Sequence, residues 1–210
     1  MLVTTYKVTW LETIKTYTIM NTKPFLYIHI PKTAGVSISV SGLVKPKDWS
    51  NHNRASDIDK LGDFYSFCFV RNPYHRIYSS YRFYTTQTER GNKNNRRKIS
   101  AFTTYSDFVM GFPGSAKCDN KHFATQTSYV YGGGKQLVDY VGKFETLTKD
   151  WKTIQKNNPI YHEYTELPDI NKSAAPVLDI YTPEMAEKIY NHYKDDFINF
   201  GYDKDSYISL

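Results

Sequence analysis

Residues 24–39, which read PFLYIHIPKTAGVSIS, constrain the fold of this chain more than any other stretch. They begin with a run of aromatic and β-branched residues, which predicts a buried strand, and the run ends at Pro31. Small residues follow, and apolar positions then return at a spacing that suits a helix. A strand, a tight loop and a helix start direct backbone N–H groups toward one point, and a loop lysine adds positive charge. The stretch therefore predicts a phosphate-binding loop built around Lys32.

The order of residues in this loop separates it from the P-loop of nucleotide hydrolases. That motif reads GxxxxGK[ST], whereas here the lysine precedes the glycine. The segment PKTAGVS, residues 31–37, instead resembles the 5′-phosphosulfate loop of sulfotransferases, which often reads PKTGGTS or PKTAGTS. An ordinary strand–turn–helix with an exposed lysine is the alternative. The resemblance implies that the donor's 5′-phosphosulfate is bound by Lys32, Thr33, Ala34, Gly35, Val36 and Ser37, with valine where the family often has threonine.

A second strand–loop–helix pattern occurs at residues 67–81, FCFVRNPYHRIYSSY. Pro73 suits the first position of a helix, and Arg71 stands where the strand ends. Ser79 follows eight residues later, so a helical serine can return toward the arginine and help it to clamp a phosphate. The pattern resembles the 3′-phosphate site of sulfotransferases, F-x-x-V-R-[ND]-P-x-x-R-x-x-S. Two phosphate sites after two strands of one sheet imply the donor 3′-phosphoadenosine 5′-phosphosulfate (PAPS).

The resemblance extends over residues 24–202 and implies an α/β fold, a P-loop-like three-layer sandwich with a central parallel sheet flanked by helices. We expect residues 1–23 to form an N-terminal arm or strand and residues 24–210 a single sulfotransferase domain. A further strand is predicted over residues 138–145. The loop that begins at Leu167 resembles the family's L-P-x-x-N-x-S segment, which implies that Lys172 and Ser173 contact the donor; a plain surface loop is the alternative.

Two histidines are candidates for the catalytic base. His52 precedes Gly62 by ten residues, and in the uronyl 2-O-sulfotransferases, which this chain resembles, a histidine in this interval acts as the base. The alternative for His52 is a loop histidine that caps a helix or faces solvent. His122 begins a segment similar to the family's H-x-x-x-Q-x-x-Y-[LV] pattern, and its spacing from Gln126 predicts that both lie on one face of a helix.

Three further expectations concern the helices and a polar run. His75 is expected on the surface, and Arg76 is expected either to pair with a carboxylate or to be solvated. Thr182 is predicted to cap one long helix that ends at Gly201. Residues 89–98, ERGNKNNRRK, predict a solvated loop or a lip that attracts an acidic acceptor; they contain no aromatic residue for stacking on bases, which argues against nucleic acid.

Composition limits the remaining choices. A net charge of +6 suits an anionic donor, the two cysteines do not indicate disulfides, and the scattered histidines imply no metal site. The chain contains neither an apolar run near the ~18 residues of a membrane span nor a signal peptide. The Golgi sulfotransferases of animals, which this chain resembles, carry a membrane anchor before the catalytic domain. We therefore expect either a trimmed form of such a protein or a naturally compact, cytoplasmic enzyme of bacterial or viral origin, and we favour the second. The sequence does not indicate its oligomeric state.

The function expected from the resemblance is transfer of a sulfuryl group from PAPS to an acceptor hydroxyl by in-line displacement. The family favours a hydroxyl on a carbohydrate, while lipids, small metabolites and tyrosyl peptides stay open as acceptors. Two other functions are considered. A P-loop-like kinase would require the GxxxxGK[ST] motif, which is absent. A non-catalytic nucleotide- or glycan-binding module on the same fold would bind the donor without turnover.

Overall fold

A computed structural model gives the fold. It describes residues 23–41, 52–86, 104–115, 121–157, 166–168 and 180–209. The expected donor contacts Lys172 and Ser173, residues 1–22 of the expected arm and the whole polar run at 89–98 lie outside these described residues.

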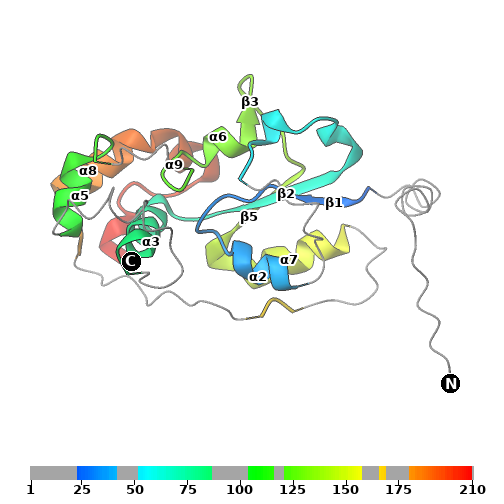
Figure 1. Ribbon diagram of the computed structural model, residues 1–210, viewed down its shortest axis with the longest axis horizontal. Coiled ribbons are helices and arrows are strands. Elements are labelled where there is room, and N and C mark those ends of the chain that lie inside the picture. The colour runs from blue at the N-terminus through cyan, green and yellow to red at the C-terminus, as the bar shows by residue number, and fades with distance from the viewer. Residues whose placement is uncertain are drawn as a thin grey trace.

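The centre of the fold is a parallel sheet of three strands in the order β1-β2-β5 (Figure 1). The strands are β1 (Phe25–Tyr27), β2 (Tyr65–Val70) and β5 (Tyr140–Lys143). β2 lies in the middle, with Phe67 opposite Tyr27 on one side and Tyr140 on the other. Because all three strands are parallel, their carboxyl ends meet at one edge of the sheet. The predicted parallel sheet is confirmed.

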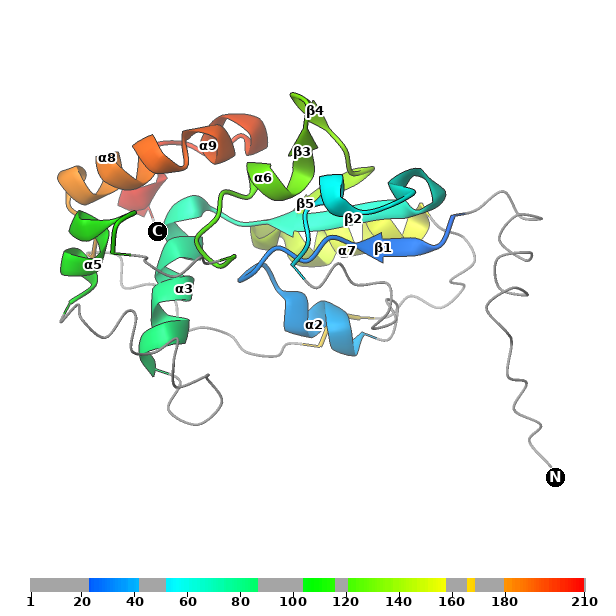
Figure 2. The same cartoon turned by 45° about the horizontal axis from the view of Figure 1, so that its top comes forward.

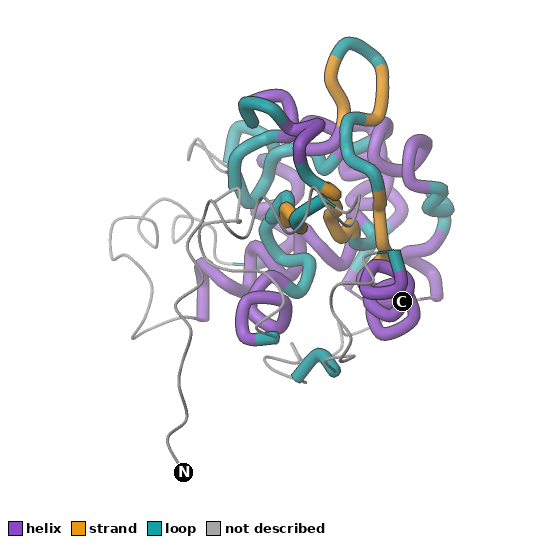
Figure 3. The backbone as a smooth tube through the Cα atoms, turned by 90° about the vertical axis from the view of Figure 1, so that its right-hand side faces the viewer, coloured by secondary structure: helices purple, strands orange, loops and turns teal. Residues whose placement is uncertain are grey.

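Alternation along the strands divides the apolar side chains between the two faces of the sheet. On one face, Phe67 and Phe69 pack with Ile38 of α2 (Gly35–Val40) and Trp151 of α7 (Leu147–Lys156). On the other face, Cys68 and its neighbours pack beneath α6 (Thr127–Val130) and α9 (Lys194–Phe200). Figures 1 and 3 show helices on both sides of the strands, so the predicted flanking of the sheet by helices is confirmed.

A helical layer continues from the carboxyl end of β2. Helix α3 (Pro73–Thr86) begins directly after that strand and packs against α5 (Tyr105–Gly111) and α8 (Pro183–His192), as Figure 2 shows. The remaining elements are the hairpin β3 (Tyr131–Gly132) and β4 (Lys135–Gln136), and the 3₁₀ turns η2 (Ala55–Asp57), η3 (Leu61–Asp63), η4 (Phe144–Thr146) and η6 (Ser206–Ser209). None of the described helices is long and apolar enough to cross a membrane.

The last helix differs from the prediction of one continuous helix. Thr182 does cap its start, but the chain breaks at Tyr193 (φ −104°, ψ 22°) into α8 and α9, and Gly201 ends α9 at φ 63°. The Tyr193 hydroxyl donates to the Phe123 carbonyl (2.8 Å). The break also lets the buried Asp196 carboxylate accept hydrogen bonds from a neighbouring segment. Hydrogen bonds to a distant segment thus accompany the break between α8 and α9.

That neighbouring segment also differs from its prediction. His122 and Gln126 were expected on one helix face, whereas residues 121–126 form turns and α6 starts only at Thr127. Asp196 accepts from the backbone N–H groups of Gln126 (2.8 Å) and Thr127 (2.7 Å). The carboxylate thus caps the start of α6, where N–H groups have no helical partner.

Candidate active site

The site lies where β1 and β2 end, which is the edge at which open parallel sheets bind their ligands. Three segments meet there: the loop after β1, the start of α3 after β2, and the turns at residues 121–126. Two hydrogen bonds join the last two segments. The Gln126 side chain accepts from the Arg71 N–H (2.8 Å) and donates to the Arg71 carbonyl (2.8 Å). Both backbone polar groups of Arg71 are therefore satisfied by one buried amide.

The loop after β1 has an unusual backbone. Lys32 (φ 70°) and Ala34 (φ 72°) adopt the left-handed region, which residues other than glycine seldom occupy. The Thr33 hydroxyl donates to the Ile30 carbonyl (2.7 Å) and closes the turn. Ser37 is buried beside the loop, whereas the Val36 side chain is 50% exposed. Such strained conformations concentrate at ligand-binding sites.

Gly35 is required by the packing under the loop. A Cβ atom at this position would overlap the imidazole of His29, so no other residue fits without displacing that ring. The close approach brings the loop backbone directly against the end of the β1 run. The glycine that the family pattern predicted is thus explained by a contact with a histidine that the pattern does not include.

Lys32 lies partly enclosed at the centre of the site. Its Nζ is 4.6 Å from the centroid of the Phe83 ring, and burial, with a smaller contribution from Arg71, lowers its pKa to about 8. An enclosed ammonium group beside a second cation favours an anionic ligand, because the anion replaces the lost hydration. The alternative of an ordinary exposed lysine does not fit this burial.

Arg71 joins the two predicted phosphate loops. The side chain is 8% exposed. Its Nη1 donates to the Lys32 carbonyl (3.4 Å), and its Cζ is 4.2 Å from the centroid of the Phe144 ring. Its Nε is buried and has no hydrogen-bond partner among the described residues. A buried guanidinium with an unused N–H is suited to a phosphate.

Helix α3 brings three further side chains to this area. Ser79, which the sequence predicts to face Arg71, is buried. His75, expected on the surface, is half-buried with its Nε2 shielded, because the imidazole packs at the end of β2 near Arg71 and Glu145. Arg76, expected to pair or to be solvated, is 1% exposed and donates to the Ala124 carbonyl.

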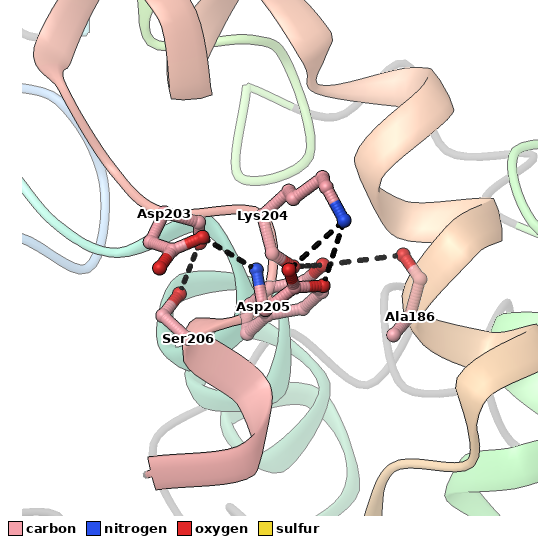
Figure 4. Close-up of polar contacts among 6 residues, drawn as sticks. Ala186, Asp203, Lys204, Asp205 and Ser206 are labelled. Atoms are coloured by element: carbon pink, nitrogen blue, oxygen red, sulfur yellow. Dashed lines mark hydrogen bonds and ion pairs between the residues drawn. The ribbon is translucent and has the colours of Figure 1, made fainter.

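The start of α3 is held by the C-terminal turn. The Asn72 N–H donates to Glu145 (2.8 Å), and the Asn72 side-chain amide donates to the Ser206 hydroxyl (2.9 Å). Ser206 in turn donates to the Asp203 carbonyl (2.6 Å), and the hydroxyl of Tyr74 donates to the Lys204 carbonyl (2.7 Å); Figure 4 shows this turn beside Ala186. The position of Arg71 thus depends on residues more than 130 positions away in sequence.

Both candidate bases lie close together, in a cluster with a third histidine that the sequence did not single out. The ring centroids of His29 and His52 are 4.2 Å apart, and those of His52 and His122 are 5.9 Å apart. Burial is the main cause that lowers the pKa of His29 to about 3 and that of His122 to about 3. The only sequence signal for His29 is a polar residue inside the apolar run before Pro31.

The hydrogen bond of His52 determines which of its nitrogens can accept a proton. His52 Nδ1 lies 3.0 Å from the His29 carbonyl oxygen. A carbonyl can only accept, so the proton is on Nδ1 and the lone pair of the neutral ring is on Nε2. Burial is the main cause that lowers the pKa of His52; the hydrogen bond to the His29 carbonyl opposes this shift, and Lys121 acts in the same direction as burial. His52 is therefore a neutral imidazole with a basic Nε2 near neutral pH.

His122 has a different environment. Its Nδ1 lies 3.0 Å from the Tyr84 hydroxyl, and its ring stacks on Phe83, the same ring that Lys32 contacts. Among the described residues, no group of three or more histidine, cysteine, aspartate or glutamate side chains could hold a metal ion. The three imidazoles thus lie beside the lysine loop as neutral rings that are tilted to one another, with the His122 ring stacked on Phe83.

A comparison with protein families identifies the family of this chain. The model of the sulfotransferase family matches residues 15–203. The chain belongs to the sulfotransferase family. The match includes both loops and all three clustered histidines of this sulfotransferase. Neither the comparison with curated proteins nor that with solved structures found a match.

The enclosure of Lys32 generates a direct prediction. In the free protein the ammonium group should lose its proton near pH 8, below the ordinary lysine range, because burial disfavours its charged form. NMR titration of ¹³Cε-labelled lysines measures this, and the Lys32→Met variant assigns the signal. Added inorganic pyrophosphate should raise the value, because an anion stabilises the charge. Titration in the ordinary lysine range would show that Lys32 is solvated.

Proposed function

We propose that this sulfotransferase transfers a sulfuryl group from PAPS to an acceptor hydroxyl, on a carbohydrate, by in-line displacement. One observation carries the proposal. The Lys32 loop follows β1 and Arg71 follows β2, which are neighbouring strands, and Arg71 Nη1 donates a hydrogen bond to the Lys32 carbonyl. Two cationic loops in contact fit one nucleotide that has phosphate groups at both ends. Sulfotransferases of this family generally use PAPS, which supports the same donor.

The loop after β1 suits the 5′-phosphosulfate. Lys32 supplies charge to the transferred group and to the leaving phosphate, and the backbone N–H groups of residues 33–37 supply donors. The Thr33 hydroxyl is engaged with the Ile30 carbonyl, so we assign that residue's contribution to its N–H. Val36, whose side chain is exposed, lacks the hydroxyl of the threonine that the family often has at this position. Its backbone N–H can still donate to the phosphosulfate. Fixed donors aimed at developing charge are the usual source of most of the rate in such transfers.

The second loop suits the 3′-phosphate. Arg71 offers an unused Nε and Ser79 a hydroxyl from the first part of α3, whose N-terminus favours an anion. Lys172 and Ser173, which lie outside the described residues, stay a prediction for the same ligand.

His52 is the proposed base. In the transfer, the acceptor oxygen forms a bond to sulfur, the bond from sulfur to the 5′-phosphate oxygen breaks, and 3′,5′-diphosphoadenosine leaves. The acceptor proton moves to Nε2 of His52, whose lone pair is set by the hydrogen bond from Nδ1 to His29. The His29 carbonyl therefore positions the base without touching the substrate. The choice of a carbohydrate acceptor rests on the resemblance alone.

The donor assignment predicts a ligand preference. The nucleotide 3′,5′-diphosphoadenosine should raise the melting temperature more than 5′-AMP or ATP does, because only it occupies both loops and binding to the native state alone stabilises the protein. Arg71→Ala should remove most of this preference. The exposed Arg82 on α3 offers a control of equal charge, and Arg82→Ala should keep the preference. An equal response of the wild type to 5′-AMP would contradict the assignment.

The base assignment predicts different effects at two histidines. His52→Asn, which can still donate to the His29 carbonyl, should lower the rate of sulfuryl transfer by about 10²–10⁴ and leave binding of 3′,5′-diphosphoadenosine intact. Because burial lowers the His52 pKa, the wild-type rate should fall only below about pH 6.5, the ordinary histidine value. Transfer of labelled sulfate from PAPS across an acceptor panel measures both.

The parallel variant His122→Asn decides between the candidates. If it loses activity while His52→Asn keeps it, the base is His122. If neither variant matters, the proton leaves through another group. A protein that binds the donor but transfers no sulfate to any acceptor would be the non-catalytic module instead.

A further inference from the structure

We propose that His75 is a specificity residue for the donor's 3′-phosphate, to which its Nε2 donates a hydrogen bond beside Arg71. This inference rests on the proposed function, because it assigns a further ligand to the same donor. It concerns a side chain that the sequence predicts to lie on the surface and that the two phosphate patterns leave unspecified.

The position of His75 on α3 supports this role. His75 and Ser79 are four residues apart on a 14-residue helix, so they lie on one face, with His75 one turn nearer to the helix N-terminus. Pro73 begins the helix, which places His75 in its first turn, where the helix dipole favours an anion. Arg71 stands two residues before Pro73, and its guanidinium acts on the His75 imidazole. The helix face that carries His75 and Ser79 therefore begins beside Arg71.

Unused hydrogen-bonding groups provide an independent observation. The Nε2 of His75 and the Nε of Arg71 are both buried, and neither has a hydrogen-bond partner among the described residues. Arg71 as a whole is 8% exposed. Buried polar atoms almost always have partners, so two unpartnered nitrogens beside one helix N-terminus point to a ligand-binding site. A phosphate accepts from both and satisfies both.

The neighbouring charges explain why His75 is neutral in the free protein. Burial and the Arg71 guanidinium lower the His75 pKa to about 4, and Glu145 acts in the opposite direction. Glu145 is itself occupied, since its two oxygens accept from the Asn72 N–H (2.8 Å) and the Tyr202 hydroxyl (2.9 Å). A neutral imidazole can donate from Nε2 without repelling Arg71. A bound phosphate dianion would raise the His75 pKa, so binding should take up protons as the pH falls.

Calorimetric binding of 3′,5′-diphosphoadenosine and of 5′-AMP to the whole protein tests the proposal. His75→Phe keeps the ring volume and removes both nitrogens, so it should weaken 3′,5′-diphosphoadenosine by about tenfold, the effect of one hydrogen bond to a charged group, and change 5′-AMP by less than about twofold on the same basis. The control is His192→Phe. His192 is a half-buried histidine on α8, packed against Phe112, and its variant should change neither affinity.

A second variant separates donation from protonation. His75→Gln retains an N–H donor that does not titrate, so it should recover most of the affinity. Titrations near pH 6 in two buffers of different ionisation enthalpy count the protons taken up on binding. The wild type should take up more protons than His75→Gln. Protons that the ligand's phosphate gains or loses on binding are common to both proteins, so the difference between them reports on His75 alone. This measurement holds even if His75→Phe fails to fold.

The outcomes distinguish this proposal from the function on which it rests. If wild-type protein binds 3′,5′-diphosphoadenosine no better than 5′-AMP, the donor assignment fails and the role of His75 fails with it. If the wild type shows the preference and His75→Phe, folded, keeps all of it, only the role of His75 is overturned. Equal proton uptake by the wild type and His75→Gln would overturn it as well.

Discussion

The parallel pairing of β1 with β2 is the interaction on which the site depends. It brings two short strand–loop–helix units to one edge of the sheet and sets Phe67 opposite Tyr27, so that both loops emerge side by side. A one-residue shift in this register would turn every side chain of a strand to the opposite face. The alternation of Phe67, Cys68 and Phe69 between two packed faces makes such a shift costly. The contact of Arg71 with the Lys32 carbonyl then follows from the register.

The second requirement is that distant segments satisfy the backbone where β2 ends. Gln126 bonds both backbone groups of Arg71, Asp196 bonds the N–H of Gln126, and Glu145 bonds the N–H of Asn72. These groups are removed from water and would each cost stability if unpaired. Because the three side chains come from separate turns and helices, the arginine is fixed in position only when the whole domain has folded.

Sequence reasoning captured what local residue order determines and missed what tertiary bonds determine. The order of small residues around Lys32, and the spacing of Arg71 and Ser79, predicted two loops after two strands; the resemblance implied the parallel sheet, which is confirmed. The break at Tyr193 and the turns before α6 were not predictable, because both depend on hydrogen bonds to residues about 70 positions away. The burial of His75 and the place of His29 under Gly35 likewise follow from packing between segments.

The central claim is that both loops bind one nucleotide, and a crystal structure with 3′,5′-diphosphoadenosine tests it most directly. We expect the 5′-phosphate to lie on the loop of residues 31–37, within hydrogen-bond distance of Lys32 Nζ. The 3′-phosphate should lie against the Arg71 guanidinium and the Ser79 hydroxyl. A nucleotide bound in the opposite orientation, or away from either loop, would contradict the claim.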